Sequence, residues 1–284
     1  FNTDQNKYTT LQRSTLIEFL KDDIYTQHLR FGKKIKEVSE LKGKVLIKFE
    51  DNTNDLVDIV VGADGIFSNT RSFFEKKKNE PKFKKAVALR IILKTKSELN
   101  IDEEKISLMM GKNCHIVIYP VNQNKELNLV CIIRDKKYDP DNIKTLVNKV
   151  VTQNSNLEKV FEGDLKSWPL YFTPKILPST NSKVFYIGDA FNGFLPTLAQ
   201  GAGQSIESAH ELFNLIKDDK AEIQNTYFKE RSRRAKIVKR RSNINFFAFH
   251  FSSSIMQTLR NFFMKFLVKR KSFVNSYLGI VYKN

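Results

Sequence analysis

The chain has 284 residues, enough for one large domain or two smaller ones, and 41% of them are hydrophobic. Its two cysteines are too few for a disulfide framework and show no CxxC spacing, so we expect a reduced, cytoplasmic protein without a metal site. The formal net charge is +17, but Lys and Arg are scattered along the whole chain, which favours a solvated basic surface and argues against nucleic-acid binding.

The first part of the chain predicts a helix followed by strands. Apolar residues at helical spacing predict a helix over residues 8–30. Two strands follow, over 33–41 and 44–50, joined by a tight turn. The nearly continuous apolar run LVDIVVGAD, residues 56–64, predicts one strand buried on both faces, as in a parallel sheet. A short helix is expected directly after it.

From residue 82 onward the pattern changes to β-rich segments with hairpin-length gaps, which is typical of an antiparallel sheet. Residues 141–161 predict a helix. The segment SWPLYFTPKILP contains three prolines, which exclude a regular helix there, so we expect an extended connection. KVFYIGD then predicts a return to a buried strand.

The last part of the chain predicts three helices, over residues 203–217, 221–239 and 246–269. The third is rich in Phe, but polar residues interrupt it, so it contains no apolar run of the roughly 18 residues that a membrane span needs. We expect it to pack against the domain; an interfacial helix, with peripheral membrane contact, is the alternative.

The segment DIVVGADGIFSNTR, residues 58–71, predicts a strand, a tight turn and a helix start. Gly65 permits a backbone shape or a close approach that a side chain would prevent, and Ser68 or Asn69 can cap the helix. Asp64 follows the strand, at the edge where α/β sheets bind ligands. Taken alone, the segment fits a ligand-free capped turn equally well.

The segment IGDAFNGFLPTLAQGAGQSIESA, residues 187–209, repeats that order with a longer loop. Asp189 follows a buried strand and is placed to accept hydrogen bonds from ligand hydroxyls. The run Gln200-Gly201-Ala202-Gly203 exposes backbone N–H groups at a helix N-terminus, where the dipole favours negative charge. A flavin has both complementary features: a ribityl chain rich in hydroxyls and, when reduced, negative charge along one edge of its ring.

Together the two segments resemble the FAD-dependent aromatic-ring hydroxylases, the single-component flavoprotein monooxygenases that include salicylate and 4-hydroxybenzoate hydroxylases. Their GADG…S…R and GDA…P…QGA elements correspond to VGADGIFSNTR and IGDAFNGFLPTLAQGAG here. The resemblance extends from about Tyr8 to Leu278. It implies an α/β fold with an α+β insert: a Rossmann-like FAD-binding domain, an antiparallel β-sheet substrate domain and C-terminal helices.

The resemblance also implies domain boundaries and cofactor-binding residues. The FAD-binding domain would comprise residues 1–80 and 179–218, the β-rich substrate domain 81–178 and the C-terminal helical region 219–284. Arg13, in LQRSTLIEFL, matches a family Arg that contacts FAD. The residues expected to bind FAD and NAD(P)H are Arg13, Asp64, Gly65, Arg71, Gly188, Asp189, Pro196, Gln200, Gly201, Ala202 and Gly203.

The implied reaction is hydroxylation of a small aromatic ring, with NAD(P)H reducing the flavin and O2 supplying the oxygen. The β-rich insert would form the floor of the substrate pocket, where Arg90, His115 and Tyr119 are candidates for substrate contact. For each of these residues, a structural or exposed position is the favoured interpretation, and substrate contact is the alternative. No catalytic acid or base can be named, and the oligomeric state stays open.

Three departures from the family pattern stand out. The GxGxxG that binds the ADP part of FAD is absent, which leads us to expect that the first βαβ unit is missing through N-terminal truncation. Asn192 stands where the family often has His, and Ser208 replaces a usual acidic residue. Two alternatives to a soluble hydroxylase remain: a hydroxylase of a prenylated ring at the membrane surface, as in ubiquinone biosynthesis, and a non-catalytic module that retains a flavin-binding fold.

Overall fold

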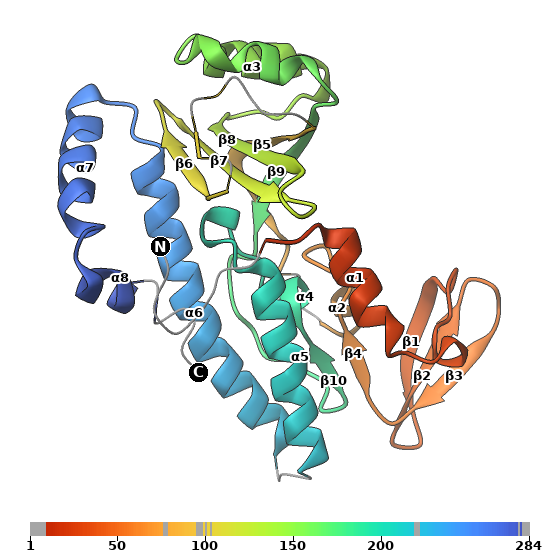
Figure 1. Ribbon diagram of the computed structural model, residues 1–284. Helices are drawn as coiled ribbons and strands as arrows, with labels where there is room; N and C mark the ends of the chain where they lie inside the picture. The colour runs from red at the N-terminus through yellow and green to blue at the C-terminus, as the bar shows by residue number, and fades with distance from the viewer. Residues whose placement is uncertain are drawn as a thin grey trace. The chain divides into compact units, whose positions relative to one another are not determined.

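The computed structural model describes residues 10–75, 79–94, 99, 101–102, 104–218, 222–277 and 279 (Figure 1). These residues divide into two compact units. The first takes its described residues from Phe1–Asp23, Lys84–Leu170 and Ile244–Asn284, and the second from Ile24–Phe83 and Tyr171–Asn243.

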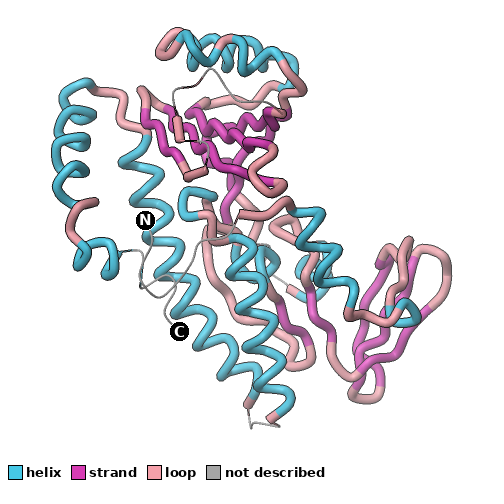
Figure 2. The backbone as a smooth tube through the Cα atoms, in the orientation of Figure 1, coloured by secondary structure: helices cyan, strands magenta, loops and turns pink. Residues whose placement is uncertain are grey.

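A five-stranded sheet with the strand order β6-β7-β8-β5-β9 forms the centre of the first unit (Figure 2). The pairs β6/β7, β7/β8 and β5/β8 are antiparallel, which confirms the antiparallel sheet predicted from residue 82. β9 lies at the edge of the sheet, the position at which a proline such as Pro169 is tolerated in a strand. The bounds are β5 Lys82–Leu93, β6 Ser107–Met110, β7 Cys114–Val121, β8 Glu126–Arg134 and β9 Lys166–Phe172.

One face of this sheet carries the apolar core of the first unit. Leu89, Ile116, Leu129 and Cys131 lie on that face and pack beneath helix α3 (Ile143–Val151). The predicted helix over 141–161 is shorter than expected, because the chain continues after α3 as two 3-10 turns, Ser155–Leu157 and Lys159–Glu162. The other face carries the more polar side chains discussed below. Cys114 and Cys131 are free, buried thiols.

The remaining helices of the first unit lie at the two ends of the chain. Helix α1 (Arg13–Asp22) buries none of its side chains. The helix ends at Asp22, and Asp23 is its C-cap residue. Among the described residues, the helix predicted over 8–30 is therefore shorter than expected, at ten residues. Helices α7 (Ser254–Leu267) and α8 (Lys271–Tyr277) follow the end of α6.

The second unit contains two small sheets. Strands β1 (Ile35–Leu41), β2 (Lys44–Phe49) and β3 (Asn54–Val57) form an antiparallel meander, and β4 (Val60–Gly62) pairs in parallel with β10 (Val184–Tyr186). The single strand predicted over 56–64 is therefore wrong. The polar residue Asp58 separates two short strands that belong to different sheets.

Helices α5 (Gly201–Lys217) and α6 (Ile223–Phe249) pack on one another in the second unit through polar contacts between their side chains. α6 is one continuous helix, so the predicted break between 239 and 246 does not occur. The intervening residues contain neither Gly nor Pro, and nothing in them stops the helix. The short helices are α2 (Asn69–Phe74) and α4 (Gly188–Asn192). Within the described residues, no helix combines the length and apolar character required to cross a bilayer.

Candidate flavin site

The two motifs found in the sequence follow strands that lie side by side. β4 and β10 pair in parallel register, with Val60 opposite Val184 and Gly62 opposite Tyr186. The ladder continues one step further, because the N–H of Ile187 donates to the carbonyl oxygen of Gly62 at 3.0 Å. Both Asp-containing turns therefore leave the carboxyl edge of one sheet, which is the edge where α/β sheets bind ligands.

The first turn is held together by its own acidic residue. Asp64 accepts hydrogen bonds from the Ser68 hydroxyl and from the N–H of Thr70, at 2.5 and 2.8 Å. Partial burial raises the pKa of Asp64, but these hydrogen bonds outweigh it and keep the pKa below its usual value. Ser68 caps α2 by accepting from the N–H of Arg71 at 3.0 Å, which confirms its predicted role. Gly65 has φ +80°, a backbone conformation that residues with a Cβ rarely adopt, so the turn favours glycine at this position.

Arg71 connects this turn to the second motif. Its guanidinium lies over the ring of Tyr186, 4.6 Å from the ring centre. The same group donates to the carbonyl oxygens of Phe191 and Leu177, at 3.2 and 3.3 Å. Charge-assisted donation to a carbonyl combined with a cation–π contact is a strong anchoring arrangement. Arg71 therefore fixes α2 against β10 and the segments on both sides of it.

The second turn depends on close packing between Gly188 and α5. Gly188 has φ +55°, and a Cβ added there would lie 2.5 Å from the Ser205 hydroxyl oxygen. The N–H of Gly188 donates to the Ser208 hydroxyl at 3.0 Å, and Ser208 donates to the Ser205 carbonyl at 2.8 Å. Ser208, a departure from the family pattern, thus joins the Asp turn to α5. Asp189 itself is exposed.

The loop between the second turn and α5 is fastened to α6. Pro196 begins a 3-10 turn, Pro196–Leu198, and Thr197 donates to the Ser242 carbonyl at 2.8 Å. Ala199 then adopts a left-handed conformation, φ 51°, immediately before α5. Asn192, at the start of this loop, is fully buried, and neither polar atom of its amide has a hydrogen-bond partner in the described part of the chain.

The first residues of α5 are exposed, and little packs against their backbone. Gln200 occupies the N-cap position but makes no side-chain cap hydrogen bond. A Cβ added at Gly201 would meet no atom within 4 Å, and one at Gly203 would meet only the Gln200 Oε1. Gly201, Ala202 and Gly203 are all exposed. The first N–H groups of the helix have no intrahelical acceptor, so they are available to an anionic or carbonyl-rich ligand.

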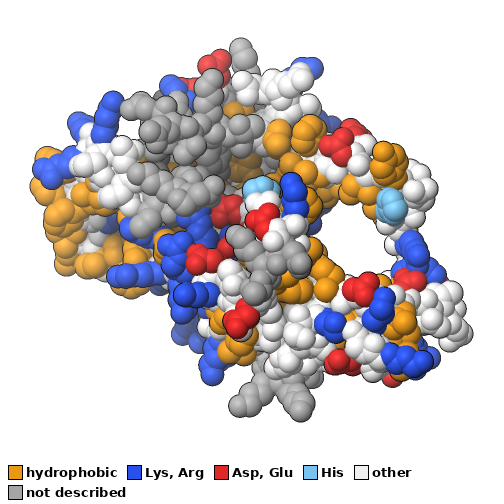
Figure 3. All heavy atoms as spheres, turned by 90° about the horizontal axis from the view of Figure 1, so that it is seen from below, with side chains coloured by type: hydrophobic (Ala, Val, Ile, Leu, Met, Phe, Trp, Pro, Cys, Tyr) orange, Lys and Arg blue, Asp and Glu red, His pale blue; other side chains and the backbone are white. Residues whose placement is uncertain are grey.

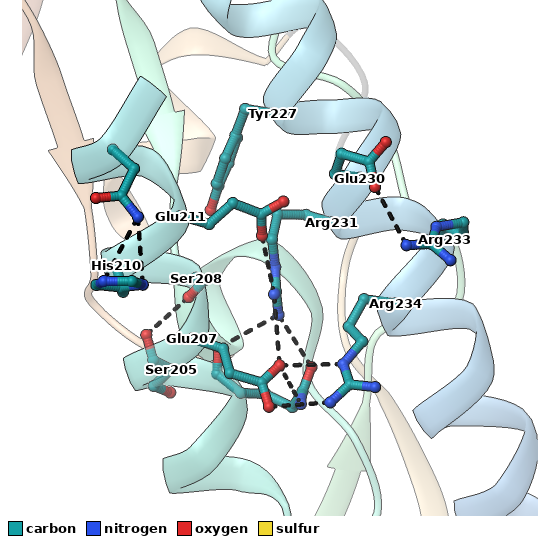
Figure 4. Close-up of polar contacts among 12 residues, drawn as sticks. Ser205, Glu207, Ser208, His210, Glu211, Tyr227, Glu230, Arg231, Arg233 and Arg234 are labelled. Carbon is teal, nitrogen blue, oxygen red and sulfur yellow. Dashed lines mark hydrogen bonds and ion pairs between the residues drawn. The ribbon is translucent and has the colours of Figure 1, made fainter. Parts of the chain in front are cut away.

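A buried ionic network stiffens α5 behind this open end (Figure 4). Arg231 of α6 donates to Glu211 at 3.0 Å and to the side-chain oxygen of Gln204 at 2.9 Å. Arg234 donates through two nitrogens to the two oxygens of Glu207, each at 3.1 Å. The Arg231 side chain is only 6% exposed. Since Gln204 lies in the first turn of α5, this network fixes the N-terminal end of the helix. No motif in the sequence predicted these contacts.

The sheet of the first unit presents a separate candidate surface on the face opposite α3. Tyr119 lies opposite Asn128, and Arg90 lies opposite Val130, so these side chains share one face. The Nε of Arg90 donates to the Asn128 Oδ1. Asn128 is fully buried, and its Nδ2 has no partner among the described residues. A half-satisfied amide beside a guanidinium suits a polar or anionic ligand group.

His115 occupies the other end of that face, where it pairs with a second histidine. Its Nδ1 lies 3.1 Å from the His250 Nε2, and the His250 Nδ1 lies 2.6 Å from the Phe246 carbonyl oxygen. His115 is 1% exposed. Burial, and then the neighbouring His250, lower the pKa of His115 to about 3, and burial also lowers the pKa of His250. This pair is a neutral, structural contact between β7 and the end of α6.

A family model described as squalene epoxidase matches residues 57–282 of this chain. The chain belongs to the squalene epoxidase family. It is also similar to the salicylate hydroxylase of Pseudomonas putida, 25% identical over 244 residues, which are 76% of this chain and 56% of that protein. A 3-amino-4-hydroxybenzoate 2-monooxygenase of Streptomyces platensis is 24% identical over 271 residues, 89% of this chain and 67% of that protein. The predicted resemblance to FAD-dependent aromatic hydroxylases is confirmed.

Solved structures show the same fold as this member of the squalene epoxidase family. HpxO of Klebsiella pneumoniae complexed with FAD and uric acid superposes with a TM-score of 0.80 at 15% identity, covering 95% of this chain and 71% of that one. A salicylate hydroxylase substrate complex superposes with a TM-score of 0.71 at 17% identity, covering 95% and 75%. The α/β architecture with an antiparallel sheet and C-terminal helices is therefore confirmed.

The structure brings together some of the residues predicted for a cofactor in this family. The second unit contains all of them except Arg13, which begins α1 in the first unit. Asp64 and Arg71 already have protein partners, whereas the α5 N-terminus is open. The assignment of these residues to FAD stays a prediction. Within the described residues, no group of three or more His, Cys, Asp or Glu side chains could hold a metal ion.

Proposed function

We propose that the chain forms most of an FAD-dependent monooxygenase that hydroxylates an aromatic ring with NAD(P)H and O2. The observation that carries this proposal is the parallel pairing of β4 and β10, which directs both motif turns to one sheet edge beside the open end of α5. The chain spans 56% of the salicylate hydroxylase that it matches. The proposed activity therefore belongs to the whole protein, of which this chain would form the larger part.

The residues at the α5 N-terminus fit a flavin. Gly201 and Gly203 leave room for a flat ring to approach the backbone, and the helix dipole stabilises negative charge there. Among the described residues, the buried Asn192 amide has no hydrogen-bond partner, and Asn192 precedes the same loop in the sequence. Asp189 is exposed after β10. When bound, FAD would supply hydride acceptance from NAD(P)H and activation of O2. The protein would supply orientation, exclusion of water and the fixed N–H dipoles.

The ADP part of FAD needs a further binding element. No GxGxxG occurs in these 284 residues. We infer that a βαβ unit outside this sequence provides it, and that β4 and β10 belong to a larger parallel sheet. A two-stranded parallel sheet is marginal on its own, and parallel sheets are normally covered on both faces. The exposure of Ile59 and Val61, at 40% and 41%, agrees with this inference.

The face of the insert that carries Arg90 and Tyr119 is the surface we assign to the substrate. Relatives are named for salicylate and for 3-amino-4-hydroxybenzoate, which are aromatic carboxylates. The Arg90 guanidinium and the Asn128 Nδ2, which has no partner among the described residues, offer donors for such a group. His115, by contrast, is occupied by His250. We therefore assign the ring's acidic substituent to Arg90 and leave His115 with a structural role.

Steady-state kinetics of an Arg90→Gln variant test this assignment. Gln retains a donor for Asn128 but removes the charge, so KM for an aromatic carboxylate should rise about tenfold or more, with a smaller effect on kcat. Arg134→Gln is the matched control, because Arg134 shares the same sheet face but lies over the Phe246 ring. An unchanged KM in Arg90→Gln would contradict the assignment. A protein that neither binds FAD nor oxidises NAD(P)H would favour the non-catalytic alternative.

A further inference from the structure

A series of side-chain hydrogen bonds leads from α6 to the N-terminal end of α5. Arg231 donates to the side-chain oxygen of Gln204 at 2.9 Å, and the Gln204 Nε2 donates to the Gln200 Oε1 at 3.4 Å. Gln204 is 2% exposed, and Gln200 is 8% exposed. The series therefore lies inside the second unit and ends at the residue directly before α5.

This series determines which way each amide is turned. A guanidinium only donates, so the Gln204 atom that faces Arg231 is the oxygen. A carboxylate only accepts, and the Gln204 Nε2 donates to Glu207 at 2.9 Å, which requires the same orientation. The Gln200 atom that faces this Nε2 is then its oxygen. Arg231 thus sets the orientation of an amide one residue further along the series.

The orientation leaves one unused donor at the N-terminal end of α5. The Gln200 Nε2 has no partner among the described residues, and the Gln200 side chain makes no cap hydrogen bond. A Cβ added at Gly203 would lie 3.7 Å from the Gln200 Oε1, so the amide lies beside the first turn of the helix. Together with the N–H groups of that turn, the Nε2 is available to the carbonyl or anionic edge of a ligand.

Burial makes this arrangement stiff. On the face that Figure 3 shows, Asp and Glu side chains lie beside Lys and Arg side chains at the surface, where water weakens such pairs. The Arg231 side chain is only 6% exposed, and it also donates to Glu211 at 3.0 Å. A reversed Gln204 amide would place donor against donor at Arg231, with little water to replace the lost hydrogen bond. The reversed orientation is therefore disfavoured.

We propose that Arg231 and Gln204 are positioning residues, which hold the Gln200 Nε2 as a hydrogen-bond donor for the flavin. The inference rests on the proposed flavin site and adds to it two residues that act through Gln200. Reduced flavin gathers negative charge along one edge of its ring, so a donor there stabilises the reduced form more than the oxidised form. Loss of the orientation should weaken FAD binding and lower the midpoint reduction potential of bound FAD.

Flavin titrations and reduction potentials of the purified protein test the proposal. Arg231→Met should raise the Kd for FAD about three- to tenfold, as expected for one hydrogen bond, and lower the potential. In a Gln200→Leu background the same substitution should change neither quantity further, because the amide that it orients is gone. Arg234→Met is the matched control, because it removes a pair with Glu207 and should leave both quantities unchanged.

Arg231→Lys keeps the proposal testable if Arg231→Met does not fold. Lys retains the charge beside Glu211, but its single nitrogen does not span the acceptors of Glu211 and Gln204 as the planar guanidinium does. It should restore most of the melting temperature and leave FAD binding weakened. Equal effects of Arg231→Met with and without Gln200, or full recovery of FAD binding in Arg231→Lys, would overturn this proposal alone. An unchanged protein that binds no FAD would overturn the proposed function as well.

Discussion

The guanidinium of Arg71 lies 4.6 Å from the ring centre of Tyr186 and joins two motifs that are far apart in the sequence. Arg71 belongs to the helix after β4, and Tyr186 ends β10. The same guanidinium donates to the carbonyl oxygens of Phe191 and Leu177. The signature Arg of the first motif thus shapes the turn of the second motif.

Replacement of Arg71 by Ala should therefore destabilise the protein. The variant loses two charge-assisted hydrogen bonds and a cation–π contact, and we expect the free energy of unfolding to fall by about 2–4 kcal/mol. Urea denaturation measures this loss. Arg30→Ala provides the control, because Arg30 pairs with Asp55 at an exposed position and should contribute less than about 1 kcal/mol. Equal losses in both variants would refute the anchoring role.

Two glycines of the second motif should respond differently to alanine. Gly188→Ala places a Cβ 2.5 Å from the Ser205 hydroxyl at positive φ, so we expect about 1–3 kcal/mol of destabilisation. Gly201→Ala meets no atom within 4 Å and lies in a helix, so stability should hold or rise slightly. If the open helix end cradles a flavin, Gly201→Ala should nevertheless weaken FAD binding about tenfold. Thermal melts and flavin titrations separate the two effects.

The network between α5 and α6 should be sensitive to the loss of its central cation. Arg231→Met leaves Glu211 and the Gln204 side-chain oxygen without their partner, while Glu207 keeps Arg234, so we expect a cost of about 2–4 kcal/mol. Arg233→Met, two residues along the same helix, removes only an exposed pair with Glu230 and should change stability by less than about 1 kcal/mol. Chemical denaturation of both variants makes the comparison. Similar small changes would show that the network does not stiffen α5.

The His115–His250 pair predicts loss of stability in acid. Both imidazoles have lowered pKa values in the folded protein, so the unfolded chain binds more protons below pH 6.5. As the pH falls from 6.5 to about 3, His115 should lower the stability by roughly 1.4 kcal/mol per pH unit, and His250 should add a further loss in the same direction. His115→Gln/His250→Gln should flatten this slope, whereas His210→Gln, at an exposed position, should not. An unaltered slope in the double variant would refute the assignment.

Local patterns in the sequence were sufficient to predict the secondary-structure elements that build the candidate site. The two strand–turn–helix segments, the Ser68 cap and the antiparallel insert all follow from residues close together in the chain. The failures have a different cause. Residues 56–64 looked like one strand because hydrophobicity does not reveal that Val57 and Val60 pair with different partners. Likewise, α6 continues past residue 239 because tertiary packing keeps a Lys- and Arg-rich stretch helical.

Interactions within the site were less predictable than the motifs. Ser208 was noted only as a departure from a family pattern, yet it binds the N–H of Gly188 across twenty residues. The partners of Arg231 lie on another helix, and only the three-dimensional packing reveals them. His115 was a candidate for substrate contact because its strand was recognised, but its partner His250 lies 135 residues further along the chain.

The absorption spectrum of the purified protein tests the flavin assignment most directly. The account predicts flavin bands in the visible range that bleach with NAD(P)H without oxygen, and faster with an aromatic carboxylate present. Gly201→Ala should lower the flavin content while leaving the melting temperature of the flavin-free protein unchanged. A colourless, folded protein that takes up no added FAD would contradict the account, since the open end of α5 would then hold no flavin.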